Sequence, residues 1–122
     1  MSNKQSIANR KSVYGIGIND ADYITEPRTR SGPRNVCPYY ARWKDMLSRC
    51  YSDQHQSRKP TYIGCSVAKE WHSFMAFKEW MIKQDWVGKQ LDKDILIVGN
   101  KIYSPESCVF VSTSLNSLLT HV

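Results

Sequence analysis

The chain has 122 residues and a mass of 14.1 kDa. Because 41% of its residues are apolar and 23% are charged, one globular domain is expected and a disordered polymer is excluded. No apolar run approaches the about 18 residues of a membrane-spanning helix, and the beginning of the sequence lacks the apolar core of a signal peptide; we expect a cytoplasmic protein without membrane contact. The net charge of +6 is concentrated in residues 1–44, which hold eight bases and three acids, a pattern typical of phosphate-backbone binders.

Residues 1–36 are expected to form a basic, irregular N-terminal arm. Two prolines and a glycine in its last ten residues disfavour regular structure. Arg28, Arg30 and Arg34 lie within seven residues of one another and are candidate contacts to a phosphate backbone. Upstream, residues 13–18 alternate apolar side chains with glycine, which predicts a short strand or a turn packed against the core.

Residues 38–51 are expected to form the first helix. Pro38 suits its first turn, and one stripe of side chains has helical spacing. This stripe consists of Tyr39, Trp43, Met46, Leu47 and Cys50. Arg42 and Arg49 are seven residues apart and therefore share a polar face. That face is either simply solvated or a surface for phosphate contact.

A polar loop over residues 52–60 and a second helix over 67–84, with Ser66 as its N-cap, are expected next. The apolar face of this helix would consist of Trp71, Phe74, Met75, Phe77, Met81 and Ile82, extended by Trp80 and Trp86. We expect this aromatic series to pack in the core, although aromatic side chains also stack on unpaired bases.

The last third of the chain predicts a strand over 91–98, turns, and a second strand over 108–111. Ser112 or Thr113 would cap a terminal helix. The apolar residues of that helix would be Leu115, Leu118 and Leu119. The order strand, loop, strand, helix is that of a ββα unit, so we expect a small α+β domain in which two amphipathic helices pack on this unit.

Five short motifs follow one another along the chain. They are Trp43-x-x-Met46-x-x-Arg49-Cys50, Tyr62-x-x-Cys65, Trp71-x-x-Phe74-x-x-Phe77, Leu91-Asp92-Lys93-Asp94 and Asn100-x-x-Tyr103-x-Pro105-Glu106-x-Cys108. Through them the chain, over residues 37–116, resembles small bacteriophage-encoded proteins of the HNH or homing-endonuclease-like type. The resemblance implies an HNH-like DNA-binding domain over residues 37–122, preceded by the arm over 1–36.

The resemblance also implies binding to double-stranded DNA and, in active members, metal-dependent cleavage of a phosphodiester. In such proteins a His on the first strand is the general base, an Asn fixes the loop, and a His or Asn on the helix holds the metal. Here Lys93 stands where the His would be, and Ser107 stands near the Asn. Asn116 and His121 in the expected terminal helix are the candidate helix ligands.

Asp92, Lys93 and Asp94 are the candidate catalytic residues. Strand alternation would place both carboxylates on one side, where they could hold Mg²⁺ and activate its water. Lys93 is a poor base, because the ordinary pKa of lysine is about 10.4 and two neighbouring carboxylates would raise it.

Two alternatives to a nuclease remain open. One is a DNA binder without catalysis, and the other is an accessory protein that binds and inhibits a host enzyme or defence complex in the host cytoplasm.

The four cysteines, Cys37, Cys50, Cys65 and Cys108, contain no Cys-x-x-Cys pair. Without an export signal, disulfides are the weaker interpretation. A structural Zn²⁺ held by Cys50, Cys65 and Cys108, with Cys37 as the fourth ligand, is one alternative. Burial as small apolar side chains is the other and the one we favour.

Overall fold

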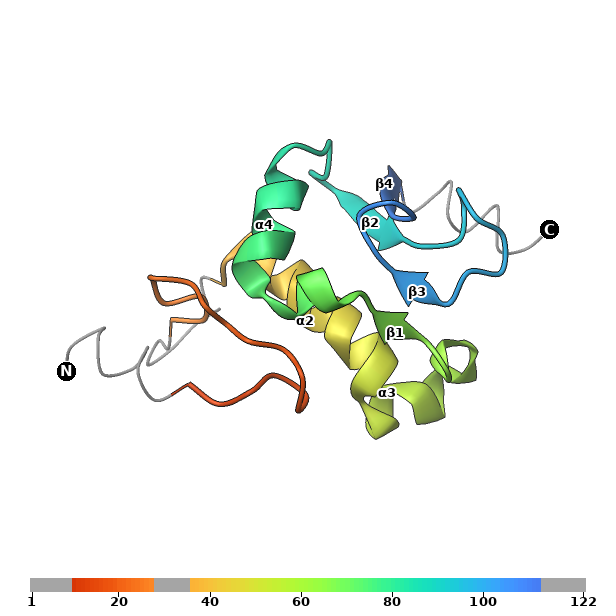
Figure 1. The fold of residues 1–122 in the computed structure, drawn as a ribbon, viewed down its shortest axis with the longest axis horizontal. Helices are drawn as coiled ribbons and strands as arrows, with labels where there is room; N and C mark the ends of the chain where they lie inside the picture. Colours follow the sequence, from red (N-terminus) through yellow and green to blue (C-terminus); the bar gives the residue numbers. More distant parts are fainter. Residues whose placement is uncertain (1–9, 28–35, 113–122) are drawn as a thin grey trace.

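The computed structural model describes residues 10–27 and 36–112, which form a small α+β fold (Figure 1). Its helices are α2 (Pro38–Tyr51), α3 (Asp53–Arg58) and α4 (Phe74–Ile82), with short 3-10 helices η1 (Pro60–Tyr62) and η2 (Lys69–His72). Its strands are β1 (Ser66–Val67), β2 (Lys89–Asp92), β3 (Ile102–Tyr103) and β4 (Val109–Ser112). β1 pairs with β3 in parallel, and β2 pairs with β4 in antiparallel orientation. Among these residues, no helix has the length and apolar character needed to span a bilayer.

Helix α2 has the bounds that the sequence predicts. Pro38 lies in its first turn, and Arg49 forms an ion pair with Asp45 one turn earlier, with 2.7 Å between nitrogen and oxygen. The buried side chains are Tyr40, Trp43, Met46, Leu47 and Cys50. The predicted stripe is therefore wrong at one position. Tyr39 is only partly buried and packs edge-on against Trp86, with ring centres 5.1 Å apart.

Ser52 joins α2 to α3, in a segment that the sequence suggests is a polar loop. Its backbone N–H donates to the Ser48 carbonyl, which closes the last turn of α2. Its side-chain oxygen accepts a hydrogen bond from the His55 N–H at 3.2 Å, which caps α3. The loop prediction for residues 52–60 is therefore wrong, because one serine ends one helix and begins the next.

The second predicted helix begins later than expected. Ser66 and Val67 pair with β3 as strand β1, so they are not available to start a helix. Helix α4 begins at Phe74, where Ser73 is the N-cap and its side-chain oxygen accepts from the Ala76 N–H. The buried side chains of α4 are Phe74, Phe77 and Met81, whereas Ile82 is exposed.

The centre of the core is a pair of tryptophans. The indole N–H of Trp43 in α2 donates to the backbone carbonyl of Trp71 in η2 at 2.8 Å, and both side chains are fully buried. The other large side chains without exposure are Met46, Leu47, Phe74, Phe77, Met81 and Tyr103. The expectation that the aromatic series packs in the core is confirmed for Trp71, Phe74 and Phe77.

The N-terminal segment over residues 10–27 is irregular, as expected, but it packs on the helices (Figure 1). Arg10 donates to three backbone carbonyls within the segment itself. Ile18 forms a bridge to Ser73, and the Asp20 carboxylate accepts from the Met75 N–H at 2.9 Å. The prediction that the basic arm lies outside the folded body is therefore wrong for these residues.

The strand predicted over 91–98 ends early. The Asp92 carboxylate accepts from the backbone N–H groups of Asp94 and Ile95, at 3.0 and 2.7 Å, and this turns the chain out of β2. The strand predicted over 108–111 is present as β4, one residue later. The predicted terminal helix lies outside the described residues.

Gly17 fits against α2 with no room for a side chain. A Cβ at this position would lie 2.5 Å from the Leu47 Cδ1 and 2.9 Å from the Trp43 ring. We expect Gly17→Ala to lower the free energy of unfolding by about 1–3 kcal/mol through overpacking, measured by urea denaturation. Gln54→Ala on exposed α3 is the control, and equal stability of the two variants would contradict this packing.

Candidate functional site

A cavity of about 400 Å³ lies where α2, η1, the end of β2 and the following loop meet. Four residues that the sequence analysis singles out line it together: Arg49, Asp92, Lys93 and Asp94. Lys101 from the loop before β3 also lines it. Three cationic and two acidic side chains therefore face the same space.

Arg49 reaches the cavity from α2 and is held firmly by the protein. One guanidinium nitrogen donates to the Leu91 carbonyl and to the Tyr103 hydroxyl, both at 3.2 Å, and the other pairs with Asp45. The guanidinium also lies over the Tyr62 ring, and the side chain is only 17% exposed. Burial lowers the pKa of Arg49, but the Tyr103 and Asp45 oxygens outweigh it and keep the pKa above its usual value. Of the two alternatives for the polar face of this helix, a simply solvated face does not hold for Arg49.

Asp92 forms the turn at the rim of the cavity. Burial raises the pKa of Asp92 above its ordinary value, and the nearby Asp94 carboxylate adds to this, against the two backbone N–H groups that lower it. Asp94 lies beyond the end of β2, so the alternation expected along a strand does not relate the two residues. They nevertheless line one cavity, because the turn brings Asp94 back beside Asp92.

Lys93 is buried between the two aspartates, with 8% of its surface exposed. Its ammonium lies 3.7 Å from an Asp94 oxygen and 5.6 Å from the centre of the Tyr103 ring. Lys93 therefore adds an ion-paired ammonium to the lining of the cavity.

Asn100 and Lys101 are site residues that the sequence analysis did not select. The Asn100 amide donates to the carbonyls of Lys93 and Ile102, at 2.8 and 2.6 Å, and thereby closes the loop over the cavity. The Lys101 ammonium donates to the Thr61 carbonyl at 2.7 Å and joins the loop to η1. Asn100 opens the last of the five motifs, which was a usable signal, whereas no pattern marks Lys101.

Ser107, which the resemblance places near the loop-fixing Asn, has a different task. Its hydroxyl donates to the Ile102 carbonyl at 3.0 Å and lies 2.8 Å from the Ser104 hydroxyl. These contacts hold the turn between β3 and β4. Asn100, and not Ser107, is the residue whose side chain fixes the loop of the cavity.

Among the described residues, the other predicted nucleic-acid contact is Arg42, which does not line this cavity. Arg42 lies over the Trp86 ring, 5.0 Å from its centre, on the part of α2 nearer the N-terminus. Arg28, Arg30 and Arg34 lie outside the described residues, as do Asn116 and His121.

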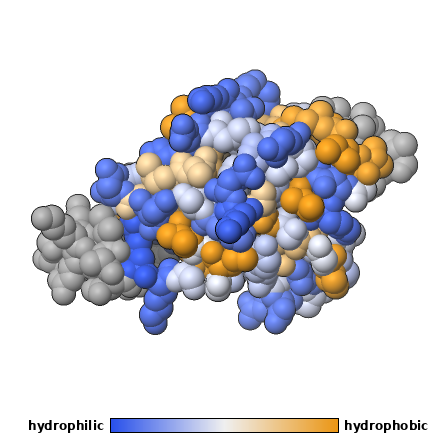
Figure 2. Space-filling model, in the orientation of Figure 1, coloured by the Kyte–Doolittle hydropathy of each residue, from blue (hydrophilic) through white to orange (hydrophobic). Residues whose placement is uncertain are grey.

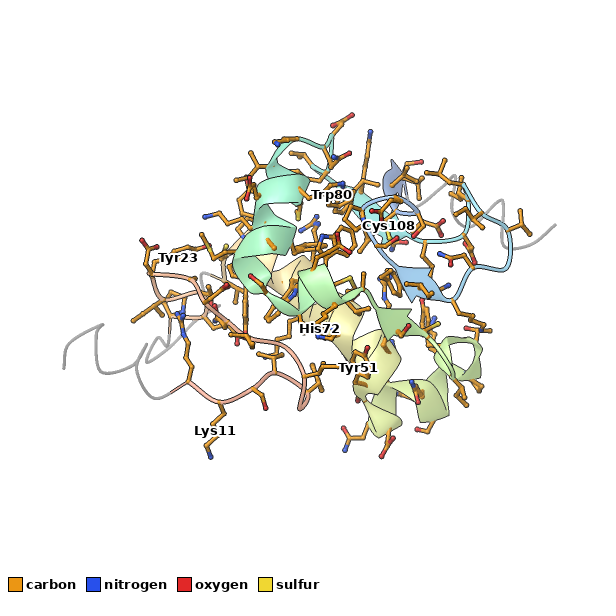
Figure 3. The ribbon with its side chains drawn as sticks, viewed as in Figure 1. Lys11, Tyr23, Tyr51, His72, Trp80 and Cys108 are labelled. Carbon is orange, nitrogen blue, oxygen red and sulfur yellow. The ribbon has the colours of Figure 1, made fainter. Side chains whose placement is uncertain are left out.

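The four cysteines do not all lie in one place, because Cys37 is far from the others. Cys37 is the N-cap of α2, and its sulfur lies 3.2 Å from the Tyr23 hydroxyl. Cys50 lies near the other end of the same helix, about 20 Å away at the rise of about 1.5 Å per residue. Tyr23 and Cys108 also lie on opposite sides of α4 (Figure 3). A zinc site with Cys37 as fourth ligand is therefore wrong, since two sulfurs on one zinc are about 4 Å apart.

The remaining three cysteines are buried as free thiols. Burial raises the pKa of Cys50 to about 12 and that of Cys108 to about 11, so both thiols are neutral at physiological pH. Over residues 10–27 and 36–112, no group of three or more His, Cys, Asp or Glu side chains has the arrangement of a metal site. The burial of Cys50, Cys65 and Cys108 agrees with their interpretation as small apolar core residues.

In comparisons with known proteins, no family, curated protein or solved structure matches this chain.

Thiol reactivity tests the placement of the cysteines. At pH 8 we expect one thiol, Cys37, to react quickly with a chromogenic disulfide reagent, because it alone of the four is only partly buried. The other three should react only as fast as the protein unfolds, and all four should react at once in denaturant. Cys37→Ser should remove the fast phase; fast reaction of two or more thiols in that variant would contradict the burial described here.

Proposed function

We propose that this protein binds duplex DNA and that the cavity at the end of β2 receives a backbone phosphate. The observation that carries the proposal is the convergence of Arg49, Lys93 and Lys101, from three separate segments, on one cavity. Such a cavity suits an anion that is larger than a simple halide and rich in hydrogen-bond acceptors.

The three cations would take different parts in binding. Arg49 has its nitrogens committed to protein oxygens, so it supplies fixed charge and holds β2 in place. Lys93 supplies a second charge from below the surface. Lys101 is the exposed member, and its ammonium has donors left for a phosphate oxygen beyond the one given to Thr61.

The charge of the rest of the chain supports the same partner. All eleven acidic residues lie in the described part of the chain. Every Lys, Arg, Asp or Glu beyond it is therefore basic, and Arg28, Arg30 and Arg34 are among them. We propose that these three arginines, with Arg42, contact phosphates further along the duplex. The resemblance to phage HNH-like proteins points to the same class of ligand.

Cleavage of the bound phosphodiester is a second candidate function, favoured by the two carboxylates in the cavity. The Asp92 carboxylate accepts a hydrogen bond from the Asp94 N–H and is partly withdrawn from water. Carboxylate oxygens are the ligands that Mg²⁺ prefers, and Mg²⁺ would neutralise charge on a phosphate and lower the pKa of a water. Asp92 and Asp94 would hold the ion, and Lys93 would contact the phosphate.

The salt dependence of binding tests the electrostatic part of this proposal. If about five phosphates are neutralised, affinity for a short duplex should fall by about 10²–10³-fold between about 50 and about 200 mM salt, measured by fluorescence anisotropy. Lys101→Gln should reduce the logarithmic slope by about one. Lys69→Gln is the control, because Lys69 is exposed and does not line the cavity.

A flat salt dependence, or equal slopes for the two lysine variants, would contradict phosphate binding in the cavity. If duplex DNA does not bind at all, and a host protein is still captured after nuclease digestion of the lysate, the protein is an effector that acts on a host complex.

Nicking of supercoiled plasmid tests the second candidate function. We expect nicking with Mg²⁺ or Mn²⁺ that is lost in Asp92→Asn and in Asp94→Asn while DNA binding persists. Because burial raises the pKa of Asp92, its ionised form costs stability at neutral pH, and an Asn oxygen can still accept the two backbone N–H groups. Asp92→Asn should therefore remain folded. Asp53→Asn on exposed α3 is the control. If the wild-type protein nicks with neither ion, cleavage is contradicted and DNA binding is the only proposed function that remains.

A further inference from the structure

The loop between β2 and β3 carries a projecting apolar tip. Leu96, Ile97 and Val98 are consecutive and exposed, and Val98 is 93% exposed, more than any other large hydrophobic side chain among the residues described. Figure 2 shows hydrophobic surface at the end of the molecule where this loop lies in Figure 1. Single exposed apolar side chains are ordinary, whereas a cluster marks an interaction site.

The loop that carries the apolar tip also lines the cavity. Asp94 before the tip, and Gly99, Asn100 and Lys101 after it, are lining residues. The surface beside the proposed phosphate site is thus apolar, and the site itself is cationic. A ligand that fits both must present phosphate and apolar surface close together.

The base of the loop is fixed by hydrogen bonds. Asp92 holds the outgoing chain through the N–H groups of Asp94 and Ile95, and Asn100 ties the returning chain to the Lys93 carbonyl. The Asn100 N–H donates to the Ile97 carbonyl at 3.1 Å, which closes a turn beneath the tip. A tip held in this way needs little further ordering when it binds.

Two copies of this chain would not cover the tip well. A two-fold contact through it would bring Lys101 of one copy near Lys101 of the other, and like charges repel. The three exposed apolar side chains of the tip also supply much less than the about 800 Å² per partner that a stable interface buries. The cationic side chains beside the tip favour a polyanion as the partner.

Resting on the proposed function, we propose that the tip formed by Leu96, Ile97 and Val98 inserts between base pairs from the minor groove while the cavity holds an adjacent phosphate. The flat faces of an opened base step are the apolar surface, and the backbone beside the step supplies the phosphate. Aliphatic wedges flanked by cations unstack a step in this way and bend the duplex towards the major groove. The protein is then a DNA-bending protein that senses how easily a step opens.

The experiment uses the full chain with a duplex that carries end-placed fluorophores for energy transfer and a 2-aminopurine at each step in turn. Wild-type protein should shorten the end-to-end distance and raise 2-aminopurine emission at a pyrimidine–purine step. Leu96→Ser with Val98→Ser should abolish both signals and weaken binding about tenfold, with an unchanged salt slope. Val87→Ser is the matched control, since Val87 is an exposed valine that lies outside the loop.

The outcomes separate the two proposals. Salt-dependent binding without bending or unstacking by wild-type protein overturns the wedge and leaves the proposed function standing, whereas no binding to duplex DNA removes both. Bending that survives in the double variant also overturns the wedge. So does a tip-dependent affinity for anionic vesicles, or a tip-dependent dimer in sedimentation, if either appears while DNA bending is unaffected by the serine substitutions.

Discussion

The hydrogen bond from the Trp43 indole to the Trp71 carbonyl is the contact on which the rest of the fold depends. An indole N–H buried without an acceptor is costly, so α2 is stable only where it meets the backbone that leads into α4. Gly17 packs against the benzene edge of the same indole ring and brings the N-terminal segment into the core. Three segments distant in the sequence are thus positioned by one side chain.

Arg49 connects helix α2 to the lining of the cavity. It lies nearly two turns beyond Trp43, and its nitrogens join the helix to β2 and to β3 through Leu91 and Tyr103. The main role of this guanidinium is structural, because it binds several protein oxygens. The same contacts also fix its positive charge at the cavity. The cavity therefore depends on the packing of α2 as much as on the loop residues that line it.

The sequence predicts those features that depend on neighbouring residues. Helix α2 follows from Pro38 and its apolar spacing, and β4 follows from a short apolar run. The start of α4 was missed because Ser66 and Val67 pair with β3, a partner far along the chain that local patterns do not reveal. The two aspartates were expected together from strand alternation, but a turn and not the strand brings them together. The buried state of Arg49 and the place of Lys101 arise from contacts between separate elements.

The contact between Asp20 and Met75 has a consequence for biosynthesis. During synthesis the Asp20 carboxylate leaves the ribosome well before the Met75 N–H that it binds, because the two residues are 55 positions apart. The beginning of α4 therefore gains this acceptor only after Met75 itself has emerged. Pairing residues this far apart requires closing a long loop, which is a slower step than forming a local helix such as α2.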